Sequence, residues 1–332
     1  MMTDMLQEKR RKDYDVTNSV KVTSANSVCL SVREIFCSLY AAEKFSPVQQ
    51  SFEDFERLFE GEFEGYQACD TFYHDKQHTL DMTLALARLI EGYQQLHKKE
   101  DQLSADYVVI GLITALYHDS GYIRETDDPT INGSVYTKVH ITRSARFLSN
   151  YLPMIGLNGY VDIAKNIVHY TGYEIKPSDI KLPDKKLHTI GHMLGSADLI
   201  AQMSDRCYLE KCRDRLYPEF VLGNVAETRQ DDGTTTLLYS SGNNLLEKTP
   251  AFYHLEINSR LNDLFNGVYQ YAEQHFGDSN HYIDTLETNM CHLDNLIHDG
   301  NLDKLSRIPL VNNGTVFVNT TNSEEIKKLK IK

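Results

Sequence analysis

The middle of the chain carries histidines and aspartates in an order typical of metal-dependent hydrolysis. They are His74, His78, the adjacent pair His118 and Asp119, then His140, His169 and Asp198. Neutral imidazoles and carboxylates are side chains that hold divalent transition metals in proteins. Two such ions that share a carboxylate lower the pKa of water from about 15.7 toward 7, which produces a nucleophile for a phosphate ester. The set therefore predicts a two-metal site that cleaves phosphate esters.

Helices must bring these residues together, because they are far apart in the sequence. Apolar residues recur at helical spacing in five segments, 79–97, 104–119, 140–153, 161–169 and 187–216. Thr79 is the predicted N-cap of the first segment, so His78 lies at a helix entrance. The pair His118 and Asp119 ends the second helix. Asp198 lies within the longest one.

Several stretches of this region resemble the HD-domain superfamily of metal-dependent phosphohydrolases. They are YHDKQHTLD at 73–81, LYHDSG at 116–121, IVHYTGY at 167–173, SAD at 196–198 and DRCY at 205–208. The first is most similar to the cyclic nucleotide phosphodiesterases. The last three look like the HD-GYP branch, which acts on cyclic dinucleotides. The resemblance covers about residues 72–208.

This resemblance implies an all-α fold, an HD-domain helical bundle with peripheral helices and a long surface loop or small hairpin. It also implies how two divalent metal ions are held. The first ion would bind His78, His118, Asp119 and Asp198. The second would bind His140 and His169. Imidazole ligands at the second position favour iron or manganese, with zinc or magnesium as alternatives.

By the same resemblance, a hydroxide that bridges the two ions hydrolyses a phosphodiester bond in a cyclic nucleotide or cyclic dinucleotide. Asp119 spans the ions, and His74 is the general acid, worth roughly two to four powers of ten in rate. The candidate substrate-binding residues are Arg206, Lys76 and Tyr122, with Arg124 as a further basic candidate. Arg206 is carried over from the HD-GYP branch. Tyr122 stands where that branch often has a basic residue.

Two other functions are compatible with the same residues. Some HD-fold proteins place four histidines and two aspartates around a mixed-valent di-iron centre and activate dioxygen, so an oxygenase is one alternative. A cyclic-nucleotide-binding protein without turnover is the other. Oxygen consumption, or nucleotide binding without cleavage, would separate them from a phosphodiesterase.

The 332 residues, 41% of them hydrophobic, are predicted to form a single catalytic domain over 28–308. Its motif core spans 72–208, and a turn-rich stretch at 223–250 is predicted to be a loop insertion on the surface. The polar segment 1–27 is predicted to be flexible, and 309–332 to be a peripheral tail.

The net charge of -13 opposes binding to nucleic-acid polymers and to anionic membranes. A small anionic substrate of nucleotide type remains compatible, because metal ions in the site outweigh distant surface carboxylates. The six cysteines include no CxxC pair, which indicates reduced thiols and a cytoplasmic protein. No apolar stretch has the length of a membrane span. The sequence leaves a homodimer open.

Overall fold

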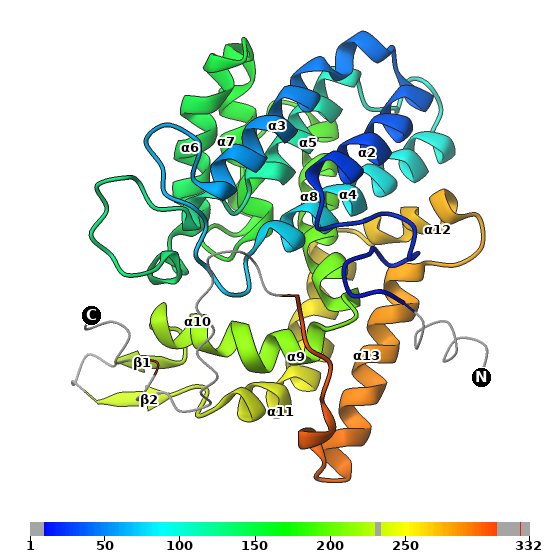
Figure 1. Cartoon of the computed structure of the whole chain (residues 1–332). Helices are drawn as coiled ribbons and strands as arrows, with labels where there is room; N and C mark the ends of the chain where they lie inside the picture. The colour runs from blue at the N-terminus through cyan, green and yellow to red at the C-terminus, as the bar shows by residue number, and fades with distance from the viewer. Residues whose placement is uncertain (1–9, 230–233, 311–325, 327–332) are drawn as a thin grey trace.

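The computed structural model describes residues 10–229, 234–310 and 326 (Figure 1). Over these residues the protein is all-α apart from one small hairpin, which confirms the predicted fold class. The strands β1 (Glu227–Arg229) and β2 (Thr235–Leu237) pair antiparallel inside the predicted insertion. In the part of the chain described here, no helix combines the length and the apolar character needed to cross a membrane.

Twelve α-helices of different length make up most of the described chain. They are α2 (Ala25–Leu39), α3 (Ser46–Glu60), α4 (Lys76–Leu96), α5 (Ala105–Tyr117), α6 (His140–Met154), α7 (Val161–Ile167), α8 (Lys185–Ser204), α9 (Tyr208–Lys211), α10 (Tyr217–Leu222), α11 (Gly242–Phe252), α12 (Tyr271–Phe276) and α13 (His281–His298). In the view of Figure 1, α2 to α7 form the upper part, and α9 to α11 lie below with the hairpin.

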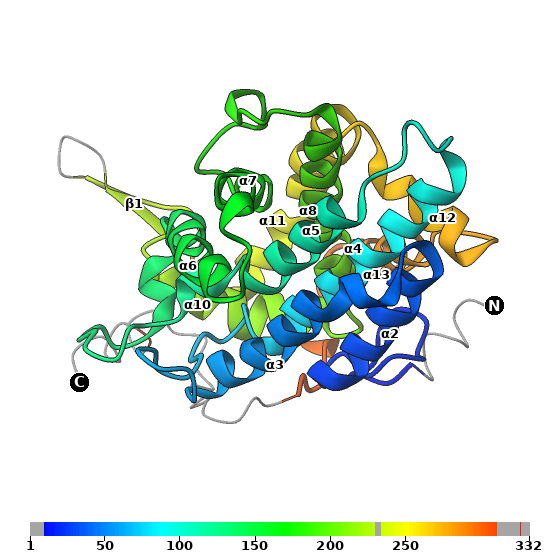
Figure 2. The same cartoon turned by 90° about the horizontal axis from the view of Figure 1, so that it is seen from above.

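Helix α5 lies in the middle of the upper bundle, where α3, α4, α7 and α8 all contact it (Figure 2). Its sequence explains this position. Every residue from Val108 to Tyr117 is buried, and the helix contains a single charged residue, Asp106. A helix that is apolar on all sides is stable only in the interior of a protein. The residues that directly follow α5 therefore lie in the interior of the protein.

Helix α4 begins one turn earlier than predicted, because Asp75 and not Thr79 is its N-cap. The Asp75 carboxylate accepts a hydrogen bond from the amide of His78 at 2.9 Å. Asp75 also pairs with the buried Arg215, at 3.2 Å from its Nη1 atom. An ordered N-cap fixes the direction in which the chain enters a helix. His78 consequently lies inside the first turn of α4.

The long helix predicted over 187–216 is interrupted at Asp205, so this prediction was wrong in its extent. Helix α8 ends at Ser204, and Asp205 leaves the helical conformation with a ψ of 137°. The Asp205 carboxylate accepts hydrogen bonds from the amide of Cys207 and from Nζ of Lys211, each at 2.6 Å. An aspartate that bonds to nearby backbone amides competes with helix continuation. The chain then turns into α9.

The described part of the N-terminal segment, from residue 10, packs against the helical body. Asp15 is fully buried, and its carboxylate lies 2.6 Å from Nη2 of Arg88 on α4. Arg10 donates to the carbonyl of Ser204 at 2.8 Å. The prediction of a flexible segment over 1–27 did not anticipate these contacts, because they join residues far apart in the sequence. Residues 1–9 lie outside the described chain.

The insertion predicted over 223–250 contains the hairpin and also the start of α11. Ser241 caps this helix by accepting a hydrogen bond from the amide of Asn244 at 3.0 Å. The hairpin projects from the body of the protein in Figure 2. The predicted tail over 309–332 lies almost entirely outside the described residues.

Candidate metal centre

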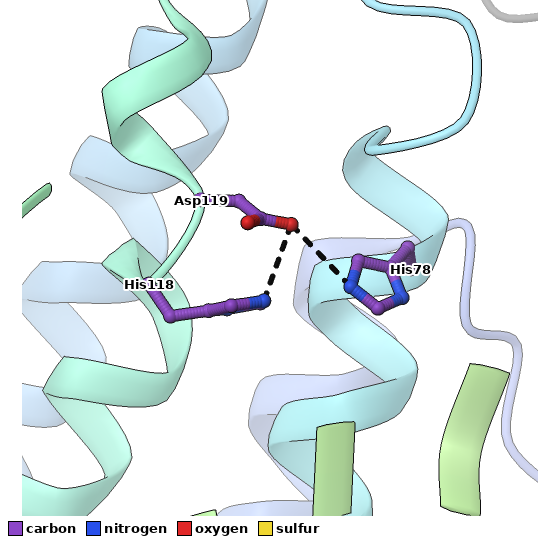
Figure 3. A group of neighbouring side chains, drawn as sticks. All are labelled: His78, His118 and Asp119. Atoms are coloured by element: carbon purple, nitrogen blue, oxygen red, sulfur yellow. Dashed lines mark ion pairs between the residues drawn. The ribbon is translucent and has the colours of Figure 1, made fainter. Parts of the chain in front are cut away.

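Helices α4, α5, α6 and α8 bring the predicted metal ligands together. His78 comes from the first turn of α4, and His118 and Asp119 directly follow α5. His140 is the first residue of α6, and Asp198 lies in the middle of α8. Figure 3 shows the side chains of His78, His118 and Asp119 pointing toward one another.

The side chains of four of these residues form a compact and buried group, namely His78, His118, Asp119 and Asp198. Nε2 of His78 lies 3.1 Å from Oδ1 of Asp198 and 3.3 Å from Oδ2 of Asp119. Nε2 of His118 lies 3.2 Å from the same Oδ2 atom. One ligand atom from each of His78, His118 and Asp119 can be chosen so that all lie within 4.8 Å of one another. Ligands of one ion at roughly 2.0 to 2.2 Å have such separations, so this group could hold a metal ion.

Two buried atoms of the group lack a hydrogen bond of acceptable geometry, namely Nε2 of His118 and Oδ2 of Asp119. Buried polar atoms in folded proteins nearly always have a partner. Nδ1 of His118 is within 2.8 Å of the carbonyl oxygen of Ala115, to which its N–H donates, so the lone pair lies on Nε2. This arrangement is typical of a metal-binding histidine. The two unsatisfied atoms therefore fit a cation.

The two carboxylate oxygens of Asp119 face different histidines. Oδ2 faces His78 and His118, whereas Oδ1 lies 3.7 Å from Nε2 of His140. The N–H at Nδ1 of His140 donates to the carbonyl of Thr137 at 2.7 Å, which again leaves Nε2 as the free ligand atom. A carboxylate in this position can bridge two ions. The geometry therefore fits a second ion between Asp119 and His140.

A glycine allows α6 to approach the turn after α5. A Cβ atom on Gly121 would lie 1.8 Å from the carbonyl oxygen of His140, so any larger residue would separate the two segments. The amide of Gly121 donates to Oγ of Ser144 at 2.8 Å, and Nε of Arg143 donates to its carbonyl at 2.7 Å. These contacts hold His140 beside Asp119.

The carboxylates of the group require positive charge next to them. Burial opposes protonation of His78, but the carboxylates of Asp119 and Asp198 beside it outweigh this and raise the pKa of His78 to about 10. Burial also acts to raise the pKa of Asp119. The charges of His118 and His74 outweigh that effect and hold the pKa of Asp119 well below its usual range. A divalent ion would supply this positive charge in place of protons.

His74 lies just before α4 and is held by Glu219 of α10. Nδ1 of His74 and Oε2 of Glu219 are 2.7 Å apart, and Oε1 accepts from the amides of Tyr73 at 2.5 Å and His74 at 3.3 Å. Glu219 is fully buried. Burial lowers the pKa of His74, but the charges of Glu219 and Asp119 outweigh this and raise it. Glu219 therefore fixes the imidazole of His74 and favours its protonated form.

The ring of Tyr122 packs against two of the histidines, whose own ring centroids are 6.1 Å apart. It stacks on His74 with a centroid separation of 4.6 Å and on His140 at 4.3 Å, with interplanar angles of 17° and 21°. Tyr122 is buried and lines the cavity. The stack fixes the orientation of both imidazoles. Its contact with substrate stays a prediction.

His169, the other predicted ligand of the second ion, is not joined to this group. Among the described residues, no ion pair connects it to Asp119 or Asp198, and it does not line the cavity. His169 is buried, and its Nδ1 atom lacks a hydrogen bond. Its role as a ligand stays a prediction that the present geometry does not support.

The predicted basic substrate-binding residues lie away from the cavity. Nζ of Lys76 pairs with Glu60 at 2.8 Å, and Arg124 pairs with Asp70 at 2.7 Å. Arg206 follows the break after α8, and its carbonyl accepts a hydrogen bond from Arg307. None of the three lines the cavity.

His78, Asp119, His140 and Asp198 line a cavity of about 590 Å³. Lys138 lines the cavity near His140 and its side chain is exposed. Sequence reasoning missed Lys138, although its position two residues before a candidate ligand was a signal. It also missed Glu219, which is separated from His74 by 145 positions and has no motif around it.

We compared the chain with protein-family models, with curated proteins and with solved structures, and none of these comparisons found a significant match.

Proposed function

We propose that the protein is a metal-dependent phosphodiesterase with an HD-domain type of bundle. The observation that carries the proposal is the convergence of His78, His118, Asp119 and Asp198 on one buried group. The motif resemblance and the oriented imidazole of His74 beside this group support the same reaction.

In this proposal His78, His118, Asp119 and Asp198 hold the first ion. Oδ1 of Asp119 and Nε2 of His140 hold a second ion, which has fewer protein ligands than the first. Iron or manganese suits this mixture of imidazole and carboxylate. When bound, the ions would lower the pKa of water and offset the charge of the phosphate.

The residues around the metal group supply the remaining chemistry. Water adds to phosphorus and loses one proton to solvent, the P–O bond to the leaving alcohol breaks, and the leaving oxygen takes a proton from Nε2 of His74, which solvent then protonates again. Glu219 keeps Nδ1 occupied, so Nε2 is the nitrogen available for transfer. The products are a phosphate monoester and an alcohol. In this proposal Lys138, which lines the cavity, binds a non-bridging phosphate oxygen.

The test begins with metal-depleted protein that is reloaded with Mn²⁺ or Fe²⁺ under anaerobic conditions. We expect metal-dependent hydrolysis of bis(p-nitrophenyl) phosphate and of at least one dialkyl or cyclic phosphodiester. Replacement His74→Gln should keep the metal and lower turnover of the alkyl ester by roughly 10² to 10⁴ fold. The exposed His254 offers a matched control, because His254→Gln should change neither quantity.

The proposal is wrong if fully loaded protein hydrolyses none of these esters. Consumption of dioxygen with an organic substrate, in place of ester cleavage, would identify the oxygenase alternative.

A further inference from the structure

Part of the cavity wall is apolar, and we call this part the chamber. The chamber is formed by α8, α10, α11 and the turns around them. Its walls include Leu199, Met203, Leu216, Phe220, Leu245 and Ile257. The same cavity is lined by metal ligands and by these side chains, so one ligand can contact both.

Two polar side chains in the chamber, those of Gln202 and Thr249, already bind other parts of the protein. Nε2 of Gln202 donates to the carbonyl of Asp198, and its Oε1 accepts from the hydroxyl of Tyr73, both at 3.0 Å. The hydroxyl of Thr249 donates to the carbonyl of Leu245 at 2.9 Å. A nucleobase has several donors and acceptors on its edge, and each loses binding energy when buried without a partner. These residues offer little to a base.

Apolar side chains also extend to the rim of the cavity. Phe252 and Tyr173 both line the cavity and are 43% and 64% exposed. Exposed apolar groups around a pocket are typical of a site for an apolar ligand.

We propose that the substrate is an amphiphilic phosphodiester, in which the phosphate binds the metal group and a hydrocarbon group of several carbons fills the apolar chamber. This inference rests on the proposed function for the phosphate end. It replaces the nucleoside expected from the motifs with an alkyl or aryl group. The cavity volume of about 590 Å³ lies within the roughly 300 to 1,000 Å³ of ligand sites and leaves room for both ends.

Burial of apolar surface gives a quantitative expectation. Each buried methylene is worth about 0.8 kcal/mol, which corresponds to roughly threefold to fourfold in affinity. Affinity should therefore rise with chain length until the chamber is full, and then stop rising. The heat capacity change on binding should become more negative with each methylene.

The experiment measures binding of monomeric alkyl phosphates with ethyl, butyl, hexyl and octyl chains to Mn²⁺-loaded protein by calorimetry. We expect the dissociation constant to fall about threefold per methylene over this series. A dissociation constant that does not change with chain length would overturn the proposal. Tighter binding of nucleoside monophosphates than of octyl phosphate would also overturn it.

Two exposed apolar residues of one helical region give a matched pair of variants. Phe252→Asp should reduce the octyl-to-ethyl affinity ratio by about tenfold, because a charge at the rim opposes burial of the chain. Leu255→Asp should leave the ratio unchanged, since Leu255 is 71% exposed and does not line the cavity. Equal effects of the two variants would contradict the assignment.

Two further measurements test the source of the ligand and the proposed function separately. Vesicles of phosphatidylcholine with one tenth phosphatidic acid test a membrane source, and the net charge of -13 leads us to expect binding of free amphiphiles only. Hydrolysis of methyl and octyl p-nitrophenyl phosphate tests the proposed function separately. Equal cleavage of both esters would reject the apolar substrate and keep the phosphodiesterase. Chain-length-dependent binding without any cleavage would keep the apolar ligand and reject the phosphodiesterase.

Discussion

Glu219 holds His74 through both its ring and its backbone. One carboxylate oxygen lies 2.7 Å from Nδ1 of His74, and the other accepts from the amide of the same residue at 3.3 Å. Because Glu219 is fully buried on α10, the imidazole keeps one orientation toward the metal group. We call Glu219 a positioning residue, since it acts through His74.

Glu219→Gln is expected to lower kcat for an alkyl phosphodiester by about 10 to 100 fold, because the amide no longer stabilises a protonated imidazole. The effect on a p-nitrophenyl ester should be smaller, since that leaving group departs without a proton. Steady-state kinetics on both esters, with metal content measured in parallel, check this. Equal losses on both esters would indicate a merely structural role.

His118→Gln is expected to remove the metal, whereas His169→Gln is expected to retain it. His118 has its free nitrogen 3.2 Å from Asp119 in the buried group, and His169 has no ion pair with that group in the described residues. Mass spectrometry of bound metal after gel filtration checks the difference. Equal metal loss in both variants would show that the predicted ligand set, His169 included, is the better one.

His140→Gln is expected to lower the metal content of the protein from two ions per chain toward one. His140 faces only Oδ1 of Asp119, so its loss leaves the first ion with its ligands. Titration of metal-free protein with Mn²⁺ should then give one tight site in place of two. Loss of the tight site itself would contradict the bridging position of Asp119.

Lys138→Met is expected to raise KM for a phosphodiester about tenfold with little change in kcat, as a lost contact between a charged group and phosphate costs about 1.5 kcal/mol. Lys248→Met is a matched control, because Lys248 also lines the cavity but its Nζ donates to the carbonyl of Leu238 at 2.6 Å. A larger rise in KM for Lys248→Met than for Lys138→Met would indicate that Lys248, and not Lys138, contacts the phosphate.

Asp15→Asn is expected to destabilise the fold by about 3 to 5 kcal/mol at pH 7, because Arg88 would keep a buried charge without its partner. Burial acts to raise the pKa of Asp15, but the charge of Arg88 outweighs this and lowers it. The carboxylate therefore stabilises the fold above about pH 4, and this stabilisation is lost as the pH falls through the lowered pKa.

Urea unfolding at several pH values checks this prediction. The difference between wild type and Asp15→Asn should be largest at neutral pH and shrink below about pH 4. Asp162→Asn is the control, because its pair with Lys165 is exposed and is worth less than about 1 kcal/mol. A difference that persists at low pH would point to packing and not to charge.

The sequence alone determined the all-α class and most of the residues in the candidate site. Helical spacing of apolar residues depends on near neighbours, so helices such as α5 could be read from their own segments. The ligand candidates His78, His118, Asp119 and Asp198 were visible because their side-chain types suit metals. The same local pattern predicted that His78, His118 and Asp119 lie near helix ends and that Asp198 lies within a helix.

Only the tertiary structure decided which of these residues meet. Glu219 reaches His74 across 145 positions, and Gly121 brings His140 to Asp119 through a close backbone approach. His169 has the same side chain as His140, but among the described residues it makes no ion pair with Asp119 or Asp198. Such outcomes depend on how helices pack, and packing is set by contacts between distant segments that no local pattern encodes. The residue types came from the sequence, and their distances came from the fold.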